Sequence, residues 1–194
     1  THDVDVENEF LLQLGKTLAK WQWVEQAAYN LYYHMMKGTD PNLISVNWHH
    51  IQSFDTRIGL LDACAHFAVE EDLQEDWRKV RKLLDRASKQ RNQIVHAAFG
   101  TLHENGRVSA RLSQSAFDAM AIVRGRVVKN ELRAEFIIDL ERLQRHEREF
   151  RVLSSRILIF RVHAFGLMHS EKNSGDDGPE ITEIDTLRRD DSEA

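Results

Sequence analysis

The sequence predicts a mainly α-helical protein: an antiparallel bundle of about four long helices, with a small β-meander inserted between helices three and four. Apolar residues recur at alternating steps of three and four along most of the chain, which is typical of helices with one buried face. Only two prolines occur in 194 residues, of which 42% are hydrophobic. One segment, about 100–128, instead alternates in short runs, which is typical of strands.

The first two helices are expected over residues 7–37 and 43–70. The first has one apolar stripe, made of Leu11, Leu14, Leu18, Trp21, Ala28, Tyr32 and Met35. Glycine suits the position after a helix and proline cannot continue one, so Gly38 and Pro41 mark its end. The second helix has a stripe of the same kind, made of Ile44, Trp48, Ile51, Phe54, Ile58, Leu61 and Ala65.

The third helix is expected over 72–98, and the meander follows it. Asn105-Gly106 lies between two short alternating runs, which predicts a hairpin turn. Residues 120–128 alternate in the same way and are expected to add a third strand.

The last helix is expected over 130–168, where it would be about 55–60 Å long at ~1.5 Å per residue. Residues 1–169 are therefore expected to form one domain. Residues 170–194 combine few hydrophobic residues with many acids, which predicts a flexible tail.

Charge is unevenly distributed along the chain. The net charge is −5, but residues 1–9 carry −4 and residues 170–194 carry −6, which leaves the body between them at +5. A mildly basic body with acidic ends is compatible with an anionic ligand, although the chain as a whole is acidic.

Other classes of protein are disfavoured by what the sequence contains. The single cysteine, Cys64, excludes an intramolecular disulfide and suits a reducing compartment. The first residues lack the basic start of a secretory signal, and no run approaches the ~20 apolar residues that cross a bilayer. His49 and His50 diverge by about 100° on a helix and cannot both bind one ion. The sequence therefore predicts a cytoplasmic protein without membrane association, metal or cofactor.

One residue breaks the apolar stripe of the third helix. That stripe is made of Leu73, Trp77, Val80, Leu84 and Ala87, and the next position belongs to Arg91. Asn92 and His96 are four residues apart and share a helix face beside it. Arginine, asparagine and histidine therefore cluster on about one and a half turns, which makes them candidate site residues.

The exposed side of the same helix is basic. Its cationic residues are Arg78, Lys79, Arg81, Lys82, Arg86, Lys89 and Arg91. Lys82, Arg86 and Lys89 lead towards the cluster and are the candidate RNA-binding residues, because such a face attracts phosphates. A solvated charged face without a ligand is the alternative.

Arg91 and His96 also have a purely structural interpretation. Arg91 would then pair with Glu70, Asp55 or Asp62 across the bundle, and His96 would be a buried residue at the end of a helix.

The cluster resembles the signature of the HEPN superfamily, which is an arginine, four to six residues that often begin with a polar one, and a histidine. Here the signature is Arg91-Asn92-Gln93-Ile94-Val95-His96, late in the third amphipathic helix. The resemblance covers about residues 7–99 and 130–168, and the meander departs from the minimal bundle.

The resemblance implies a metal-independent endoribonuclease, in which two copies bring their motifs together in one cleft. His96 would act as general acid or base and Arg91 would hold the phosphate, with Asn92 orienting one of them. It also implies a homodimer, a toxin or defence role, and an antitoxin or regulatory partner. Other members of the superfamily imply the alternative, a non-catalytic nucleotide-binding or protein-interaction module.

Overall fold

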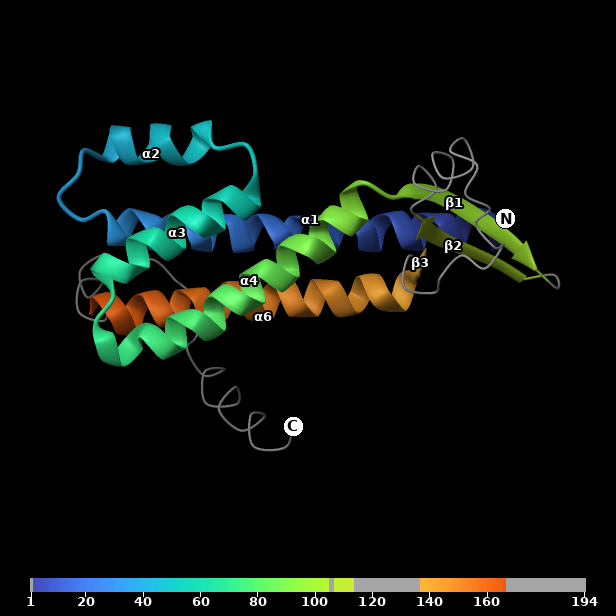
Figure 1. Cartoon of the computed structure of the whole chain (residues 1–194). Coiled ribbons are helices and arrows are strands. Elements are labelled where there is room, and N and C mark those ends of the chain that lie inside the picture. Colours follow the sequence, from blue (N-terminus) through green and yellow to red (C-terminus); the bar gives the residue numbers. More distant parts are fainter. Residues whose placement is uncertain (1, 105–106, 114–136, 167–194) are drawn as a thin grey trace, which may run out of the picture.

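The computed structural model describes residues 2–104, 107–113 and 137–166, and it is mainly helical with a small three-stranded antiparallel sheet (Figure 1). The mainly α-helical class and the presence of a small sheet are therefore confirmed. Two long helices, α1 (His2–Met35) and α6 (Leu140–Phe165), lie side by side, and α4 (Gln74–Val95) packs against α6 and α3 (Phe54–Ala68).

The segment expected to form the second helix is divided into two helices. The helix α2 (Pro41–His50) ends before Ile51, and α3 begins at Phe54. Ser53 caps α3, because its hydroxyl accepts a hydrogen bond from the backbone N–H of Thr56 at 3.5 Å. The carbonyl freed at Ile51 accepts a hydrogen bond from Nε of Arg57 at 2.9 Å. The single helix expected over 43–70 was therefore wrong.

Because of this break, the chain reverses direction once more than expected, so every later helix runs opposite to its expected direction. Ring contacts join Trp21 to Phe150 and His34 to Phe165, so α1 and α6 run in the same direction. Figure 1 shows the same parallel course. The antiparallel arrangement expected for the bundle therefore does not extend to this pair, whereas α4 does run antiparallel to α6.

The contact between α1 and α6 contains polar side chains within an apolar core. Thr17 is fully buried, and its hydroxyl lies 2.9 Å from the carbonyl oxygen of Gln13 and 3.2 Å from that of Leu143. The amide of Gln13 donates to Glu147 at 3.0 Å. Because buried polar groups are stable only when bonded, these contacts fix how the two helices pack.

A short 3₁₀ turn, η1 (Glu71–Leu73), precedes α4, which ends at Val95 and not at 98 as expected. The helix stops there because β1 (Ala98–Glu104) pairs antiparallel with β2 (Arg107–Ser113) over the full length of both strands. The hairpin expected around Asn105-Gly106 is therefore confirmed, although its turn lies outside the described residues.

The third strand of the sheet is β3 (Ile137–Ile138), which pairs with the end of β2. It occupies part of the segment that was expected to be helical. The helix α6 begins only at Leu140, because Asp139 caps it by accepting the backbone N–H of Arg142 at 2.8 Å. The strand expected at 120–128 and the tail expected at 170–194 lie outside the described residues.

The end of α6 is marked by Gly166, which has a φ of 65°. Glycine adopts this left-handed conformation without strain. The helix has 26 residues and is therefore about 39 Å long, shorter than expected. No helix in the described parts of the chain is long and apolar enough to cross a bilayer.

Candidate functional site

The helix α4 carries the Arg-Asn-x3-His motif on its last two turns. Its buried face is made of Trp77, Val80, Leu84, Ala87, Ser88 and Ile94. Arg91 follows Ala87 on this face and is half-buried. Its Nη1 donates a hydrogen bond to Oδ1 of Asn92 at 3.1 Å, and its buried Nε has no hydrogen-bond partner. Asn92 therefore orients a guanidinium that retains unused donors.

Of the three carboxylates considered as structural partners of Arg91, Asp55 and Asp62 are engaged elsewhere. Asp55 accepts a hydrogen bond from the hydroxyl of Ser88 at 2.5 Å. Asp62 accepts one from Nε1 of Trp77 at 3.0 Å and pairs with Arg81 at 3.2 Å. Within residues 2–104, 107–113 and 137–166, Arg91 forms no ion pair with a carboxylate. The structural interpretation of this arginine therefore lacks the partners it requires.

His96 lies at the C-terminal end of α4 and is exposed. Its backbone N–H donates to the carbonyl oxygen of Asn92 at 3.1 Å, which closes the last helical turn. In the described parts of the chain, no hydrogen bond joins its imidazole to Arg91. The structure therefore brings Arg91 and Asn92 together and leaves the imidazole of His96 facing solvent, not buried as the structural interpretation required.

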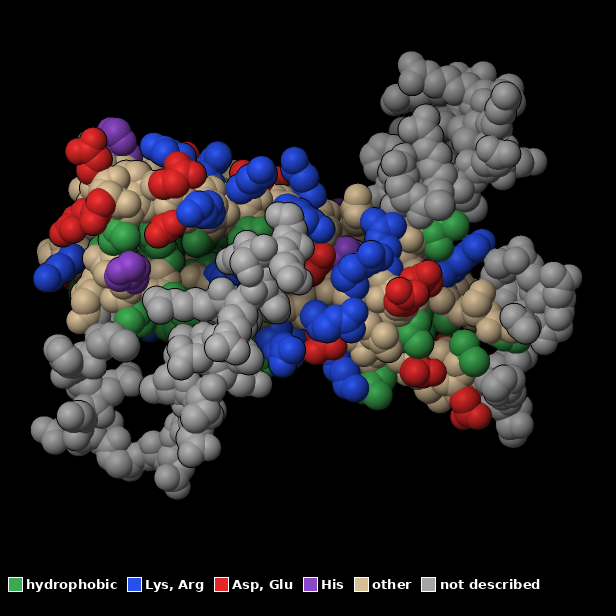
Figure 2. All heavy atoms as spheres, turned by 90° about the horizontal axis from the view of Figure 1, so that it is seen from below, with side chains coloured by type: hydrophobic (Ala, Val, Ile, Leu, Met, Phe, Trp, Pro, Cys, Tyr) green, Lys and Arg blue, Asp and Glu red, His purple; other side chains and the backbone are tan. Residues whose placement is uncertain are grey.

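The basic side of α4 has two parts that differ in how its charges are paired. In the first part, Arg78 pairs with Glu75 at 2.6 Å and Lys79 with Asp76 at 2.9 Å. In the second part, Lys82 and Lys89 are exposed and have no ion pair within the described structure. Figure 2 shows Lys and Arg side chains gathered across this side of the molecule. The unpaired charge therefore lies near the motif.

Two adjacent hollows follow the line where α4 and α6 meet, and we call them together the α4–α6 groove. One hollow lies against α4 and is lined by Lys82, Asp85, Arg86, Lys89, Gln90 and Gln93. The other, about 300 Å³ in volume, lies between the helices and is lined by Leu83, Arg86, Ala87, Gln90, Arg148, Glu149, Val152, Leu153 and Arg156. The three candidate RNA-binding residues therefore line one hollow, with Arg86 shared by both.

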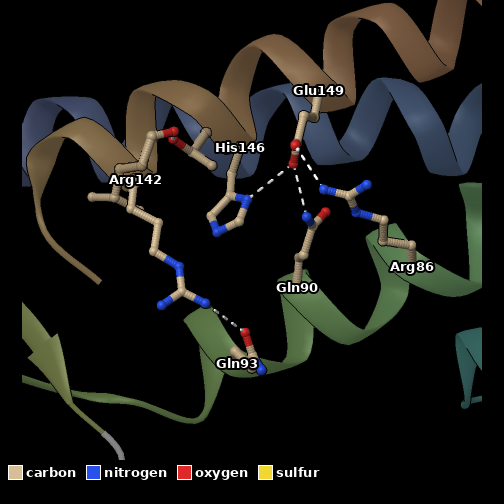
Figure 3. Close-up of polar contacts among 8 residues, drawn as sticks. Arg86, Gln90, Gln93, Arg142, His146 and Glu149 are labelled. Carbon is tan, nitrogen blue, oxygen red and sulfur yellow. Dashed lines mark hydrogen bonds and ion pairs between the residues drawn. The ribbon is translucent and has the colours of Figure 1, made fainter. Parts of the chain in front are cut away.

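The wall of the groove contains a polar cluster that the sequence did not reveal (Figure 3). Glu149 accepts hydrogen bonds from Nε2 of Gln90 at 2.8 Å and from Nη2 of Arg86 at 3.2 Å. Nδ1 of His146 lies 3.2 Å from the same carboxylate. A carboxylate only accepts hydrogen bonds, so Nδ1 of His146 carries the proton and Nε2 presents a lone pair.

His146 is buried, with only 4% of its surface exposed, and its Nε2 has no hydrogen-bond partner. Burial lowers the pKa of the imidazole. Glu149 raises this pKa, whereas the charges of Arg142 and Arg145 lower it further. Arg142 donates to Oε1 of Gln93 at 3.5 Å, so the cluster also contacts the motif-bearing end of α4. A signal was present in the sequence, because His146 occupies the apolar stripe between Leu143 and Phe150.

Comparison of this chain with protein-family models, with curated proteins and with solved structures finds no match. In the described residues, no group of three or more His, Cys, Asp or Glu side chains is placed to hold a metal ion.

Proposed function

We propose that this chain is a HEPN-like endoribonuclease that cleaves RNA without a metal ion, using Arg91, Asn92 and His96. One observation carries the proposal. Arg91 occupies a buried-stripe position without a carboxylate partner in the described structure, and its Nε is buried and unbonded. Such an arginine is unfavourable in a purely structural role, because an unpaired buried polar atom costs about 1–3 kcal/mol. A phosphate supplies the missing acceptor and the missing charge.

The residues suit cleavage by the ribose next to the scissile bond. The 2′-OH attacks the neighbouring phosphorus, the bond to the 5′-oxygen breaks, and a 2′,3′-cyclic phosphate and a free 5′-OH result. His96 takes the proton from the 2′-OH or gives one to the leaving oxygen, since an imidazole nitrogen can accept or donate a proton. Arg91 stabilises the charge that develops on the phosphate oxygens.

A second copy of the chain completes this chemistry in the proposal. His96 is five residues from Arg91, which turns the two side chains about 140° apart on a helix. The two side chains of one chain therefore point apart, so a symmetric partner supplies the His96 that acts with Arg91. The proposal therefore includes a homodimer, with RNA held along Lys82, Arg86 and Lys89. A cytoplasmic toxin or defence role, with an antitoxin as regulatory partner, fits such an activity.

A second function is favoured by one contact. Nη1 of Arg91 already donates to Asn92, and the imidazole of His96 does not contact Arg91 within the described chain. This arrangement suits a non-catalytic module that binds a nucleotide phosphate, or a protein, through Arg91. In that case the purified protein binds nucleotides and leaves RNA intact.

The test is cleavage of single-stranded RNA in the presence of EDTA. We expect cleavage by the unmodified protein, with a 2′,3′-cyclic phosphate on the product, and a loss of at least ~100-fold in both Arg91→Ala and His96→Ala. Arg78→Ala is the matched control, because Arg78 lies on the same helix but is exposed and paired with Glu75. Circular dichroism confirms that each variant is folded.

Two results would overturn the ribonuclease proposal. One is cleavage that requires an added divalent ion, and the other is full activity in both site variants. RNA left intact together with nucleotide binding that Arg91→Ala abolishes would establish the second function instead.

A further inference from the structure

We propose that the acidic segment 171–193 of the same chain docks into the α4–α6 groove. The docking itself is argued from the chemistry of the groove. Its consequence, competition with RNA for this surface, rests on the proposed function.

The groove offers an apolar floor between cationic side chains. The hollow between the helices has its floor at Leu83, Ala87, Val152 and Leu153, and its cations are Arg86, Arg148 and Arg156. Its one acidic lining residue, Glu149, is already bonded to Gln90, Arg86 and His146. Lys82 and Lys89 line the neighbouring hollow together with Asp85, which pairs with Arg81. A ligand for this surface must therefore combine negative charge with apolar groups.

The segment 171–193 has both properties. Nine acids and three bases give residues 170–194 a charge of −6. Within it, Ile181, Ile184 and Leu187 are spaced three residues apart, which places them on one side of a helical turn. Glu180, Glu183 and Asp185 flank them. The apolar side chains match the floor of the groove, and the carboxylates match its cations.

The chain length allows the segment to reach the groove without a second molecule. The described chain ends at Gly166, and Arg156 lies ten residues earlier on α6, about 15 Å along the helix axis. Fifteen residue steps separate Gly166 from Ile181, and an extended chain of this length spans up to about 50 Å. The tether is therefore more than long enough to turn back along α6.

Disulfide trapping in the full-length chain tests the docking. The background is Cys64→Ala, which removes the one native thiol. Val152→Cys on the groove floor is combined with Ile184→Cys in the segment, and oxidation is followed by mass spectrometry. We expect an intramolecular disulfide that forms quickly in low salt and at least ~10-fold more slowly in 1 M salt, because charge attraction holds the segment in place.

The matched control places the second thiol on a surface that is closer to the tether. Leu43→Cys replaces Val152→Cys, since Leu43 is 52% exposed and adjoins Ile44, which lines a hollow together with Phe165 at the end of α6. A segment that wanders without docking would reach Leu43 at least as fast as Val152. We expect the pair with Leu43→Cys to cross-link at least ~10-fold more slowly.

Three outcomes would overturn the docking: equal rates at the two positions, cross-linking at Leu43 alone, and disulfides only between two molecules. Competition has its own measurement, which is the RNA affinity of a chain with Glu180, Glu183 and Asp185 changed to Gln. We expect tighter RNA binding by at least ~3-fold in low salt. An intramolecular disulfide at Val152 without RNA binding by any variant would uphold the docking and overturn the proposed function, so the two failures are distinguishable.

Discussion

Arg91 and His146 share an unusual property, because each is a polar residue at a buried-stripe position of its helix and each has a buried nitrogen without a partner. Such nitrogens lower stability, since they have lost water and gained no hydrogen bond. The two residues come from α4 and α6, and Gln93 and Arg142 connect their surroundings at 3.5 Å. Both of these nitrogens therefore lie near the same end of the groove, beside the motif.

The buried imidazole of His146 makes the protein less stable in acid. Its pKa is lowered by burial below the unfolded value of about 6.5. On acidification the unfolded chain takes up a proton that the folded chain does not. The free energy of unfolding therefore decreases as the pH drops below about 6.5. The loss is up to ~1.4 kcal/mol per pH unit until the folded pKa is reached. Denaturant unfolding between about pH 7.5 and 5.5 measures it.

His146→Leu is the variant that isolates this effect, because leucine suits the stripe and does not titrate. Glu149 faces His146 and keeps Arg86 and Gln90 as partners in the variant, whereas Arg142 and Arg145 stay in place. We expect the acid loss to be smaller in His146→Leu than in the unmodified protein. An identical pH dependence in both proteins would show that His146 does not titrate differently in the folded state.

At the scale of the element, α4 carries its positive charge in two forms. Arg78 and Lys79 are paired one turn back with Glu75 and Asp76, whereas Lys82 and Lys89 are unpaired within the described structure. Exposed pairs of this kind contribute little to stability, but they neutralise the field that attracts phosphates. The proposed contacts with RNA are therefore expected along the part of α4 that carries Lys82 and Lys89.

A double substitution in each part of α4 tests this difference. We expect Lys82→Ala with Lys89→Ala to weaken RNA binding. The slope of log binding constant against log salt concentration should become less steep by about 1.4, which is ~0.7 for each lost phosphate contact to a single strand. Arg78→Ala with Lys79→Ala removes the same charge and should change both quantities much less. Binding titrations at several salt concentrations measure both. Equal losses in the two double variants would contradict a localised RNA surface.

The sequence predicted the helices well where periodicity was the only signal needed. It missed the break at residues 51–53, because Ile51 and Phe54 continue the apolar spacing and no glycine or proline interrupts it. It also missed β3, since Ile137 and Ile138 fit a helical stripe as well as a strand. In both cases tertiary pairing and capping decided the structure, and a local pattern does not contain that information.

The candidate site was predicted in part for the same reason. The interrupted stripe of α4 identified Arg91, whereas His146, which is buried in the stripe of α6, was not singled out from the sequence. The pairing of Arg78, Lys79 and Arg81 was also beyond the sequence, because it depends on rotamers and on Asp62 of another helix. Whether the motif cleaves RNA remains a prediction.

At the scale of the whole molecule, the extra turn at residues 51–53 determines where the groove lies. It allows α1 and α6 to run in the same direction while α4 crosses α6 antiparallel. The side of α4 that carries Leu83, Ala87 and Gln90 then borders α6 along the groove, and the motif lies at the sheet end of the molecule (Figure 1). His96 is exposed at this end, where a second copy can approach it.

Complementation between two inactive variants tests whether the site is shared by two copies. If Arg91 of one chain acts with His96 of the other, a mixed dimer of Arg91→Ala and His96→Ala contains one intact site. Random exchange gives half mixed dimers, so the mixture should recover about a quarter of the unmodified activity. Each variant mixed with itself is the control and should recover none. Native mass spectrometry confirms exchange, because the mixed dimer differs in mass from both parent dimers, and a fully exchanged mixture without activity would place Arg91 and His96 of one chain in the same site.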